Sequence, residues 1–239
     1  MAPATDEPVS EPTKPGALYI VSTPIGNPDD ISARALRVLA EVDWIVCEEM
    51  REGERLLKRH SLKGMLVDLN EHNEKTRTTE LAAELQRGKS LALISDAGTP
   101  LFYDPGALLV AAANAMGAKV TAVPGPSSLM AALVLSGLPI NRFRFVGMLP
   151  AKRAERRSAI QALLTEPMTS VLLDAPYRLS PVLSDLAAVL GESRQVVIAC
   201  DLTMPGECMV RGTLGELLER FRMRPFKGEY VILISGAVH

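Results

Sequence analysis

Three loop-like stretches combine glycine and proline with hydroxyl and carboxylate side chains, a composition that suits ligand binding. The richest spans residues 95–106 and carries Asp96 and Gly98 together with two prolines. The other two span residues 22–28 and 123–128. Glycine lets a backbone approach a ligand closely, and proline stiffens a loop. One such stretch alone is more often a capped turn between a strand and a helix, but three at one sheet edge favour a binding site.

Familiar catalytic and metal-binding signatures are absent from the sequence. A glycine-rich dinucleotide fingerprint, a Walker loop and a nucleophile-elbow serine are all missing. The histidines lie far apart and lack the spacing of metal ligands, so no metal is expected. Cys47, Cys200 and Cys208 are an odd number without a C-x-x-C pair, which indicates a reduced, cytoplasmic protein.

The elements that must position these loops alternate between short apolar strands and helices in the first half of the chain. Continuous apolar runs predict buried strands, and apolar residues at helical spacing predict helices. The expected strands are residues 18–21, 44–47, 65–69, 90–95 and 120–123, and the expected helices are residues 31–42, 78–87, 107–116 and 128–135. This alternation predicts a parallel sheet covered on both faces, with ligands at the carboxyl ends of its strands.

After a joint at residues 138–141 the pattern restarts and then changes. The expected strands are residues 143–147, 170–173, 196–202, 208–211 and 230–234, and the expected helices are residues 153–164, 179–190 and 214–221. Because few helices separate the last strands, this sheet should be mixed. The sequence therefore predicts two α/β domains with a cleft between them, covering residues 17–138 and 142–239 after a disordered tail at residues 1–16.

Composition excludes several classes of protein. The 239 residues are 47% hydrophobic and carry a net charge of −2, which is the opposite of a disordered chain or a generally basic nucleic-acid coat. No apolar run approaches the ~18 residues of a membrane span, and the acidic, proline-rich start is unlike a signal peptide. A local basic run lies between residues 142 and 157, with six bases and one acid.

In combination, the loops resemble those of the tetrapyrrole methylase superfamily of S-adenosylmethionine-dependent methyltransferases. Within it, the chain is most similar to the bacterial small-subunit ribosomal RNA cytidine ribose 2′-O-methyltransferases. The resemblance runs from about Leu18 to Gly236, and its most specific segment is Asp96-Ala97-Gly98-Thr99-Pro100. Supporting segments are residues 23–27, 71–74, 104–106, 124–127 and 227–229.

The resemblance implies a two-domain α/β fold, a homodimer, and S-adenosylmethionine bound in the interdomain cleft. Backbone groups and nearby carboxylates would suit this donor, whose sulfonium is a cation. Carried over position by position, the donor site comprises Pro24, Asp96, Ala97, Gly98, Thr99, Ser127, Ser128, Met148, Leu149, Ala175 and Pro176.

The acceptor side departs from the family pattern. The family's Glu-Asp-Thr-Arg after the second strand is Glu48-Glu49-Met50-Arg51 here. Its Glu-Ser-Pro-His-Arg is Asp-Ala-Pro-Tyr-Arg at residues 174–178, and its Glu-Leu-Thr-Lys is Asp-Leu-Thr-Met at residues 201–204. The chain also stops before the family's small C-terminal helical extension. A cytidine ribose in small-subunit RNA is the leading acceptor. The alternatives are a tetrapyrrole or other small molecule, or a catalytically inactive donor-binding paralogue.

Methylating a weakly acidic 2′-hydroxyl calls for a proton acceptor. The candidates are Glu48, Glu49 and His72, although residues 71–74 could equally cap the next helix. Phosphate contacts to ribosomal RNA or the small ribosomal subunit would come from Lys152, Arg153, Arg156 and Arg157. On charge alone, a solvated helix face explains these four residues as well.

Overall fold

The chain forms two α/β units in a computed structural model that describes residues 14–237. The first unit runs through Pro24 and resumes over Pro28–Pro126. The second unit comprises Ile25–Asn27 and the chain from Ser127 onward. Most of the tail expected at residues 1–16 lies outside the described residues.

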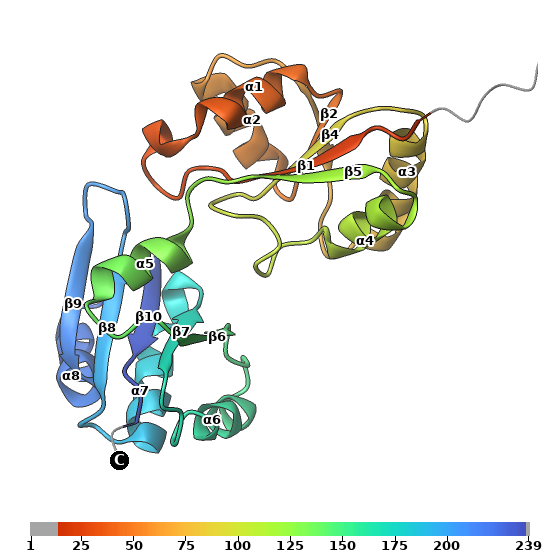
Figure 1. The fold of residues 1–239 in the computed structure, drawn as a ribbon. Helices are drawn as coiled ribbons and strands as arrows, with labels where there is room; N and C mark the ends of the chain where they lie inside the picture. The colour runs from red at the N-terminus through yellow and green to blue at the C-terminus, as the bar shows by residue number, and fades with distance from the viewer. Residues whose placement is uncertain (1–13, 238–239) are drawn as a thin grey trace, which may run out of the picture. The chain divides into compact units, whose positions relative to one another are not determined.

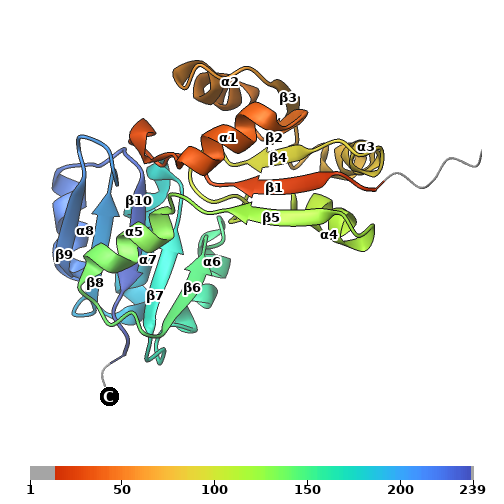
Figure 2. The same ribbon diagram turned by 45° about the horizontal axis from the view of Figure 1, so that its top comes forward.

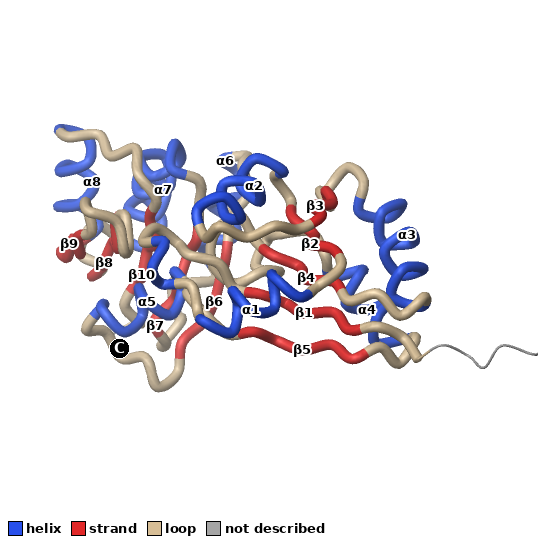
Figure 3. The backbone as a smooth tube through the Cα atoms, turned by 90° about the horizontal axis from the view of Figure 1, so that it is seen from above, coloured by secondary structure: helices blue, strands red, loops and turns tan. Residues whose placement is uncertain are grey.

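The first unit is built on a five-stranded parallel sheet, as the sequence predicts. Its strands are β1 (Ala17–Val21), β2 (Trp44–Cys47), β3 (Met65–Asp68), β4 (Leu91–Ile94) and β5 (Lys119–Val123). They lie in the order β3-β2-β4-β1-β5, which Figure 3 shows from above. All four residues of β4 are buried, as expected for a strand covered on both faces. Because every neighbouring pair is parallel, all five carboxyl ends lie along one edge of the sheet.

Helices cover both faces of this sheet (Figure 1). Helices α1 (Ala33–Glu41) and α2 (Met50–Arg59) pack on one face through Leu39 and Leu57. Helices α3 (Glu74–Gln86) and α4 (Ala107–Ala115) pack on the other through Leu81, Leu85 and Leu109. A short 3₁₀ turn, η1 (Pro28–Asp30), precedes α1. The neighbouring strands β1 and β4 are therefore followed by helices on opposite faces, the arrangement that opens a ligand crevice in α/β sheets.

Helix α2 is missing from the elements expected on sequence. Only Gly53 and Leu57 of its ten residues are buried, and most of the others are charged, so the helix contributes few apolar residues. At position 53, where α2 contacts the sheet, there is little room for a side chain, because a Cβ on Gly53 would lie 3.0 Å from Cys47 Sγ and 3.0 Å from Leu66 Cδ2. The glycine that lets α2 approach the sheet thus also leaves the helix with a single large buried apolar side chain, too few to mark it as a helix in the sequence.

The second unit holds the mixed sheet that the sequence predicts. Its strands are β6 (Phe143–Gly147), β7 (Thr169–Leu173), β8 (Gln195–Cys200), β9 (Cys208–Thr213) and β10 (Tyr230–Ile234). They lie in the order β6-β7-β10-β8-β9. Strands β6 and β7 are parallel, and the remaining pairs are antiparallel.

One face of the second sheet is covered by α6 (Arg153–Gln161), α7 (Leu179–Leu190) and α8 (Leu214–Met223), and the short turn η2 (Pro176–Arg178) leads into α7. The other face is covered by α5 (Ser128–Ser136), through Leu129 and Leu133 (Figure 2). The expected domain boundary at residues 138–142 assigned this helix to the first domain. The difference arises because α5 continues the alternation of strands and helices, and its sequence does not reveal which sheet it covers. None of the helices in residues 14–237 is long and apolar enough to cross a membrane.

Candidate functional site

The loops that follow β1 and β4 are joined by a pair of backbone hydrogen bonds. The amide of Thr23 donates to the carbonyl oxygen of Gly98 at 2.9 Å, and the amide of Gly98 donates to the carbonyl oxygen of Thr23 at 3.2 Å. Because β1 and β4 are neighbours whose helices lie on opposite faces, this pair lies where the two loops diverge. That is the position at which parallel sheets bind ligands.

Hydroxyl side chains connect the third predicted loop to the same place. Thr99 Oγ1 donates to the carbonyl oxygen of Pro126 at 3.1 Å and lies 3.0 Å from Ser22 Oγ. Thr23 Oγ1 donates to the carbonyl oxygen of Ser95 at 2.9 Å. The structure therefore brings together the parts of all three loops that belong to the first unit.

The loop at residues 95–106 contains unusual backbone conformations. Gly98 has a φ of +87°, which suits glycine. Leu101 and Tyr103 have φ values of +76° and +74°, which are uncommon for residues with a side chain. Backbone strain of this kind is concentrated at functional sites. Asp96 and Ala97 are exposed, and Gly98 beside them is buried.

Three carboxylates at this sheet edge, Glu48, Asp96 and Asp104, form what we call the acidic edge. Burial raises the pKa of Glu48, and the charges of Asp96 and Asp104 raise it further. Although Asp96 is exposed as a residue, partial desolvation of its carboxyl group raises its pKa, and the Glu49 amide, which donates to Asp96 Oδ1 at 3.3 Å, lowers it. Burial is the main cause of the raised pKa of Asp104. Crowded, partly buried carboxylates favour a bound proton or a bound cation.

The other two proton-acceptor candidates have different surroundings. Glu49 is exposed at the N-terminus of α2. His72 lies in the turn after β3, where its side chain is 86% exposed and its Nε2 lies 3.5 Å from Glu71 Oε1. Among the three candidates, Glu48 alone is partly buried.

Glu74 has a role that sequence reasoning missed. It is the first residue of α3, but its Oε1 accepts hydrogen bonds from the amides of Gly106 at 2.8 Å and Leu108 at 3.4 Å. The carboxylate thus caps α4, which begins 33 residues later, rather than its own helix. This contact fixes the end of the loop at residues 95–106, and no local spacing in the sequence could reveal it.

Among the remaining donor-site candidates, Pro24 belongs to the first unit and is half-buried. The others lie in the second unit. Ser127 caps α5, since its Oγ accepts from the Met130 amide at 3.4 Å, and Ser128 begins that helix. Met148 and Leu149 follow β6, and Ala175 and Pro176 follow β7. Strands β6 and β7 are parallel neighbours, so these four residues share one edge of the second sheet.

A buried polar atom at this edge has no partner among the described residues. Asp174 is 6% exposed, and its Oδ2 makes no hydrogen bond there. Its Oδ1 accepts from the Ala175 amide at 2.8 Å and pairs with Arg178 Nη1 at 3.2 Å. Burial raises the pKa of Asp174 despite these contacts. An orphaned buried carboxylate oxygen marks a place where a ligand group or water completes the hydrogen bonding.

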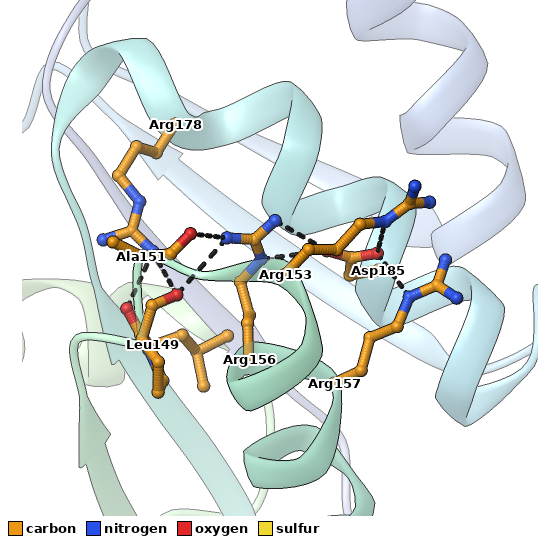
Figure 4. A network of polar contacts seen from close by, with 8 residues as sticks. Leu149, Ala151, Arg153, Arg156, Arg157, Arg178 and Asp185 are labelled. Atoms are coloured by element: carbon orange, nitrogen blue, oxygen red, sulfur yellow. Dashed lines mark hydrogen bonds and ion pairs between the residues drawn. The ribbon is translucent and has the colours of Figure 1, made fainter.

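The four basic residues expected to bind RNA differ in their exposure and in their partners within the protein. Lys152 is exposed and lies 3.3 Å from Glu155 Oε1. Arg153, Arg156 and Arg157 all contact the buried carboxylate of Asp185 (Figure 4). The side chain of Arg156 is only 8% exposed, so it is unavailable to RNA. The expectation that all four basic residues bind RNA is therefore corrected for Arg156, because its partner lies 29 residues away on α7.

Comparisons with known proteins identify a family. The model of the Tetrapyrrole (Corrin/Porphyrin) Methylases matches residues 17–218. A protein of Xylella fastidiosa (strain Temecula1 / ATCC 700964) named Ribosomal RNA small subunit methyltransferase I is 46% identical over 93% of this chain and 82% of its own length. The protein of that name from Escherichia coli O157:H7 is 44% identical over 92% of this chain and 78% of its own length.

A solved structure shares the fold. Uroporphyrin-III C-methyl transferase from Thermus thermophilus, complexed with S-adenyl homocysteine, has a TM-score of 0.65 to this chain. The alignment covers 92% of this chain and 97% of that one, at 20% identity. At this identity the likeness establishes the arrangement of the strands and helices and leaves the substrate open.

Proposed function

The chain belongs to the family of tetrapyrrole (corrin/porphyrin) methylases, and from this premise we propose that it transfers a methyl group from S-adenosylmethionine to a cytidine ribose 2′-hydroxyl of small-subunit ribosomal RNA. The choice of acceptor rests on one observation: over more than nine tenths of its length, the chain is 44–46% identical to proteins named as methyltransferases of small-subunit ribosomal RNA. The tetrapyrrole-modifying neighbour is far more distant, at 20% identity.

The residues present fit this methyl donor. Gly98 places a backbone turn with a positive φ beside the exposed Asp96 and Ala97, so this part of the loop is accessible to a nucleoside or an amino-acid moiety. The neighbouring charges that raise the pKa of Glu48 come from carboxylates, Asp96 and Asp104 first among them, and such surroundings favour a cationic sulfonium nearby. In the second unit, Asp174 Oδ2 has an unused acceptor site next to Ala175. Pro24, Thr99, Ser127, Ser128, Met148, Leu149 and Pro176 complete the proposed donor contacts.

Glu48 is the proposed proton acceptor. S-adenosylmethionine, when bound, supplies a methyl group on a positively charged sulfur. As the ribose oxygen forms its new bond to that carbon and the bond to sulfur breaks, Glu48 takes the hydroxyl proton. The acidic edge helps, because a raised pKa makes Glu48 a stronger base than an exposed glutamate. Most of the acceleration comes from holding donor and acceptor in line.

We expect Glu48→Gln to lower the turnover rate by about a hundredfold or more, the usual contribution of a positioned base. Donor affinity should be unchanged. Burial, followed by the charges of Asp96 and Asp104, raises the pKa of Glu48, so activity should fall as the pH drops through this raised value. Glu54→Gln, an equivalent change at an exposed position of α2, is the control and should keep the wild-type pH profile. If the activity of Glu48→Gln fell at low pH in the same way as that of the wild type, Glu48 would be excluded as the base.

The test of the acceptor is incubation with labelled S-adenosylmethionine and small ribosomal subunits from a strain that lacks this protein. Label in RNA supports the proposal, and digestion to nucleosides identifies the base and the methylated atom. A 2′-O-methyl group leaves no free 2′-hydroxyl, so the adjoining phosphodiester resists alkali. Label entering a tetrapyrrole added in a parallel reaction would favour the small-molecule alternative. Donor binding without any transfer would favour an inactive paralogue.

We also propose that the protein acts in the cytoplasm as a homodimer. Helix α5 exposes Met130 by 52% and Val134 by 66%, and these residues lie one helical turn apart. A second copy could cover this apolar surface. Light scattering at micromolar concentration should give a mass near twice 25.8 kDa. A mass of a single chain that persists as concentration rises would contradict the dimer.

A further inference from the structure

Asp185, in the middle of α7, binds three arginines of α6 at once (Figure 4). Its Oδ1 accepts from Arg157 Nε at 2.7 Å and from Arg153 Nε at 3.1 Å. Its Oδ2 accepts from Arg156 Nε at 2.9 Å and lies 2.7 Å from Arg156 Nη2. Three guanidinium groups on one carboxylate leave a surplus of positive charge at this point of the surface.

Arg156 makes its hydrogen bonds inside the protein. Besides Asp185, its Nη1 donates to the carbonyl oxygens of Ala151 at 2.7 Å and Pro150 at 3.3 Å. Arg178 Nη2 donates to the carbonyl oxygens of Leu149 at 2.7 Å and Pro150 at 3.0 Å. Arg156 and Arg178 thus fix the segment that leads from β6 into α6, and Arg156 anchors Asp185 in the interior.

Arg153 and Arg157 differ from Arg156 in both exposure and contacts. Their side chains are 66% and 40% exposed. Each contacts Asp185 by a hydrogen bond from Nε, and within residues 14–237 their Nη atoms donate no hydrogen bond. Because both Nε atoms bind the same oxygen, the two guanidinium groups lie side by side. Figure 4 shows their outer nitrogens pointing the same way, away from Arg156.

Two other exposed arginines, Arg55 and Arg87, contact a carboxylate through an outer nitrogen instead. Arg55 uses its Nη1 on Glu52 of the same helix, and Arg87 uses its Nη1 on Glu84. One outer nitrogen of each is therefore occupied by a neighbouring carboxylate. At Arg153 and Arg157 the carboxylate holds the inner nitrogen, so the outer fork, which matches phosphate oxygens, faces outward.

We infer that Arg153 and Arg157 form a clamp for backbone phosphates of the RNA acceptor, and that Asp185 is the positioning residue that aligns the two guanidinium groups. This inference rests on the proposed function. Two preoriented forks lose less side-chain entropy on binding than two freely rotating arginines. The clamp binds sugar–phosphate backbone without reading bases, so it contributes affinity and register rather than sequence choice.

The test measures binding of a small-subunit RNA fragment to the full chain over a series of salt concentrations. Arg153→Gln/Arg157→Gln should weaken binding about tenfold or more and flatten the plot of log affinity against log salt, by roughly 0.7 to 0.9 for each phosphate that is no longer neutralised. Arg55→Gln/Arg87→Gln removes the same charge from two exposed positions, one in α2 and one just after α3, and should leave the salt slope unchanged. Arg153→Lys/Arg157→Lys should keep the slope but lose affinity, because an ammonium lacks the planar fork.

Asp185→Asn distinguishes positioning from charge. Removing a negative charge should tighten RNA binding if only net charge matters. Positioning predicts weaker binding at unchanged donor affinity, because the guanidinium groups lose their common anchor. If Asp185→Asn does not fold, the RNA affinities and salt slopes of the paired arginine variants still test the clamp. A wild-type affinity and salt slope in Arg153→Gln/Arg157→Gln would overturn the clamp even if wild-type protein methylates RNA. Failure of the wild type to bind or methylate RNA would overturn the clamp and the proposed function together.

Discussion

Gly98→Val should abolish binding of S-adenosylmethionine while leaving the protein folded. Gly98 has a φ of +87°, a conformation in which a β-branched side chain is strongly disfavoured. Relieving that strain requires the loop to move, which breaks the two backbone hydrogen bonds between Gly98 and Thr23. Thr99 would move with it and lose its contacts to Ser22 and Pro126. Backbone strain of this kind costs about 1–3 kcal/mol, which a unit of this size can tolerate.

The matched control for this variant is Gly117→Val. Gly117 follows α4, has a φ of +74°, and has no atom within 4 Å of the position that a Cβ would occupy. The substitution therefore introduces comparable backbone strain without disturbing the loop at residues 95–106. Calorimetry should show normal donor affinity for Gly117→Val and none for Gly98→Val, with cooperative thermal unfolding in both. Unchanged affinity in a folded Gly98→Val protein would remove this loop from the donor site.

The parallel sheet could be predicted because short apolar strands alternate with helices in the first half of the chain, and the mixed sheet because few helices separate the last strands. The failures have local causes. Helix α2 was missed because Gly53 occupies one of its few buried positions. Helix α5 was expected in the first domain because its apolar residues, such as Leu129 and Leu133, would suit either sheet. Sequence patterns reveal that a face is apolar, but only the tertiary structure reveals what covers it.

In the candidate site, too, local composition could be predicted from the sequence, whereas contacts between distant residues could not. Glycine, proline and carboxylate residues pointed to the loops at residues 22–28 and 95–106 because their composition is unusual. Contacts between distant residues had no such signal. Glu74 was expected to act near its own helix, yet it caps α4. Arg156 looked like a member of an exposed basic run, yet it is buried against Asp185, which lies 29 residues further along the chain. A run of charged residues shows only the local composition, whereas the burial of one of those side chains depends on an oppositely charged partner elsewhere in the fold.

The largest effect on stability is expected from Asp185→Ala. The side chain of Arg156 is 8% exposed, and its charge is neutralised by Asp185 at 2.7 Å. Removing one member of a buried ion pair leaves the other charge uncompensated, which typically costs about 3–5 kcal/mol. Urea unfolding should report a loss of this size. The control is Glu219→Ala, which breaks the exposed Glu219–Arg222 pair and should change the free energy of unfolding by less than about 1 kcal/mol.

The stability difference between wild type and Asp185→Ala should also depend on pH. Burial favours the protonated form of Asp185, but hydrogen bonds from Arg157, Arg156 and Arg153 hold its pKa below the ordinary value. A carboxyl whose folded pKa is lowered contributes its full stability above the unfolded pKa of about 3.9 and loses it as the pH falls through the folded pKa. The difference should therefore be constant near neutral pH and shrink below about pH 4. A difference that grew on acidification would contradict this assignment.

A paired substitution separates the two roles of Asp185. Buried ion pairs can often be replaced by apolar residues of similar volume without loss of stability. Asp185→Leu combined with Arg156→Met should therefore recover much of the stability that Asp185→Ala loses. It should not recover RNA affinity, because Arg153 and Arg157 would still lack the oxygen that aligns them. Urea unfolding and RNA binding measured on the same preparation give both answers. If affinity returned together with stability, Asp185 would serve the fold alone, and the two exposed arginines would bind phosphate without a positioning residue.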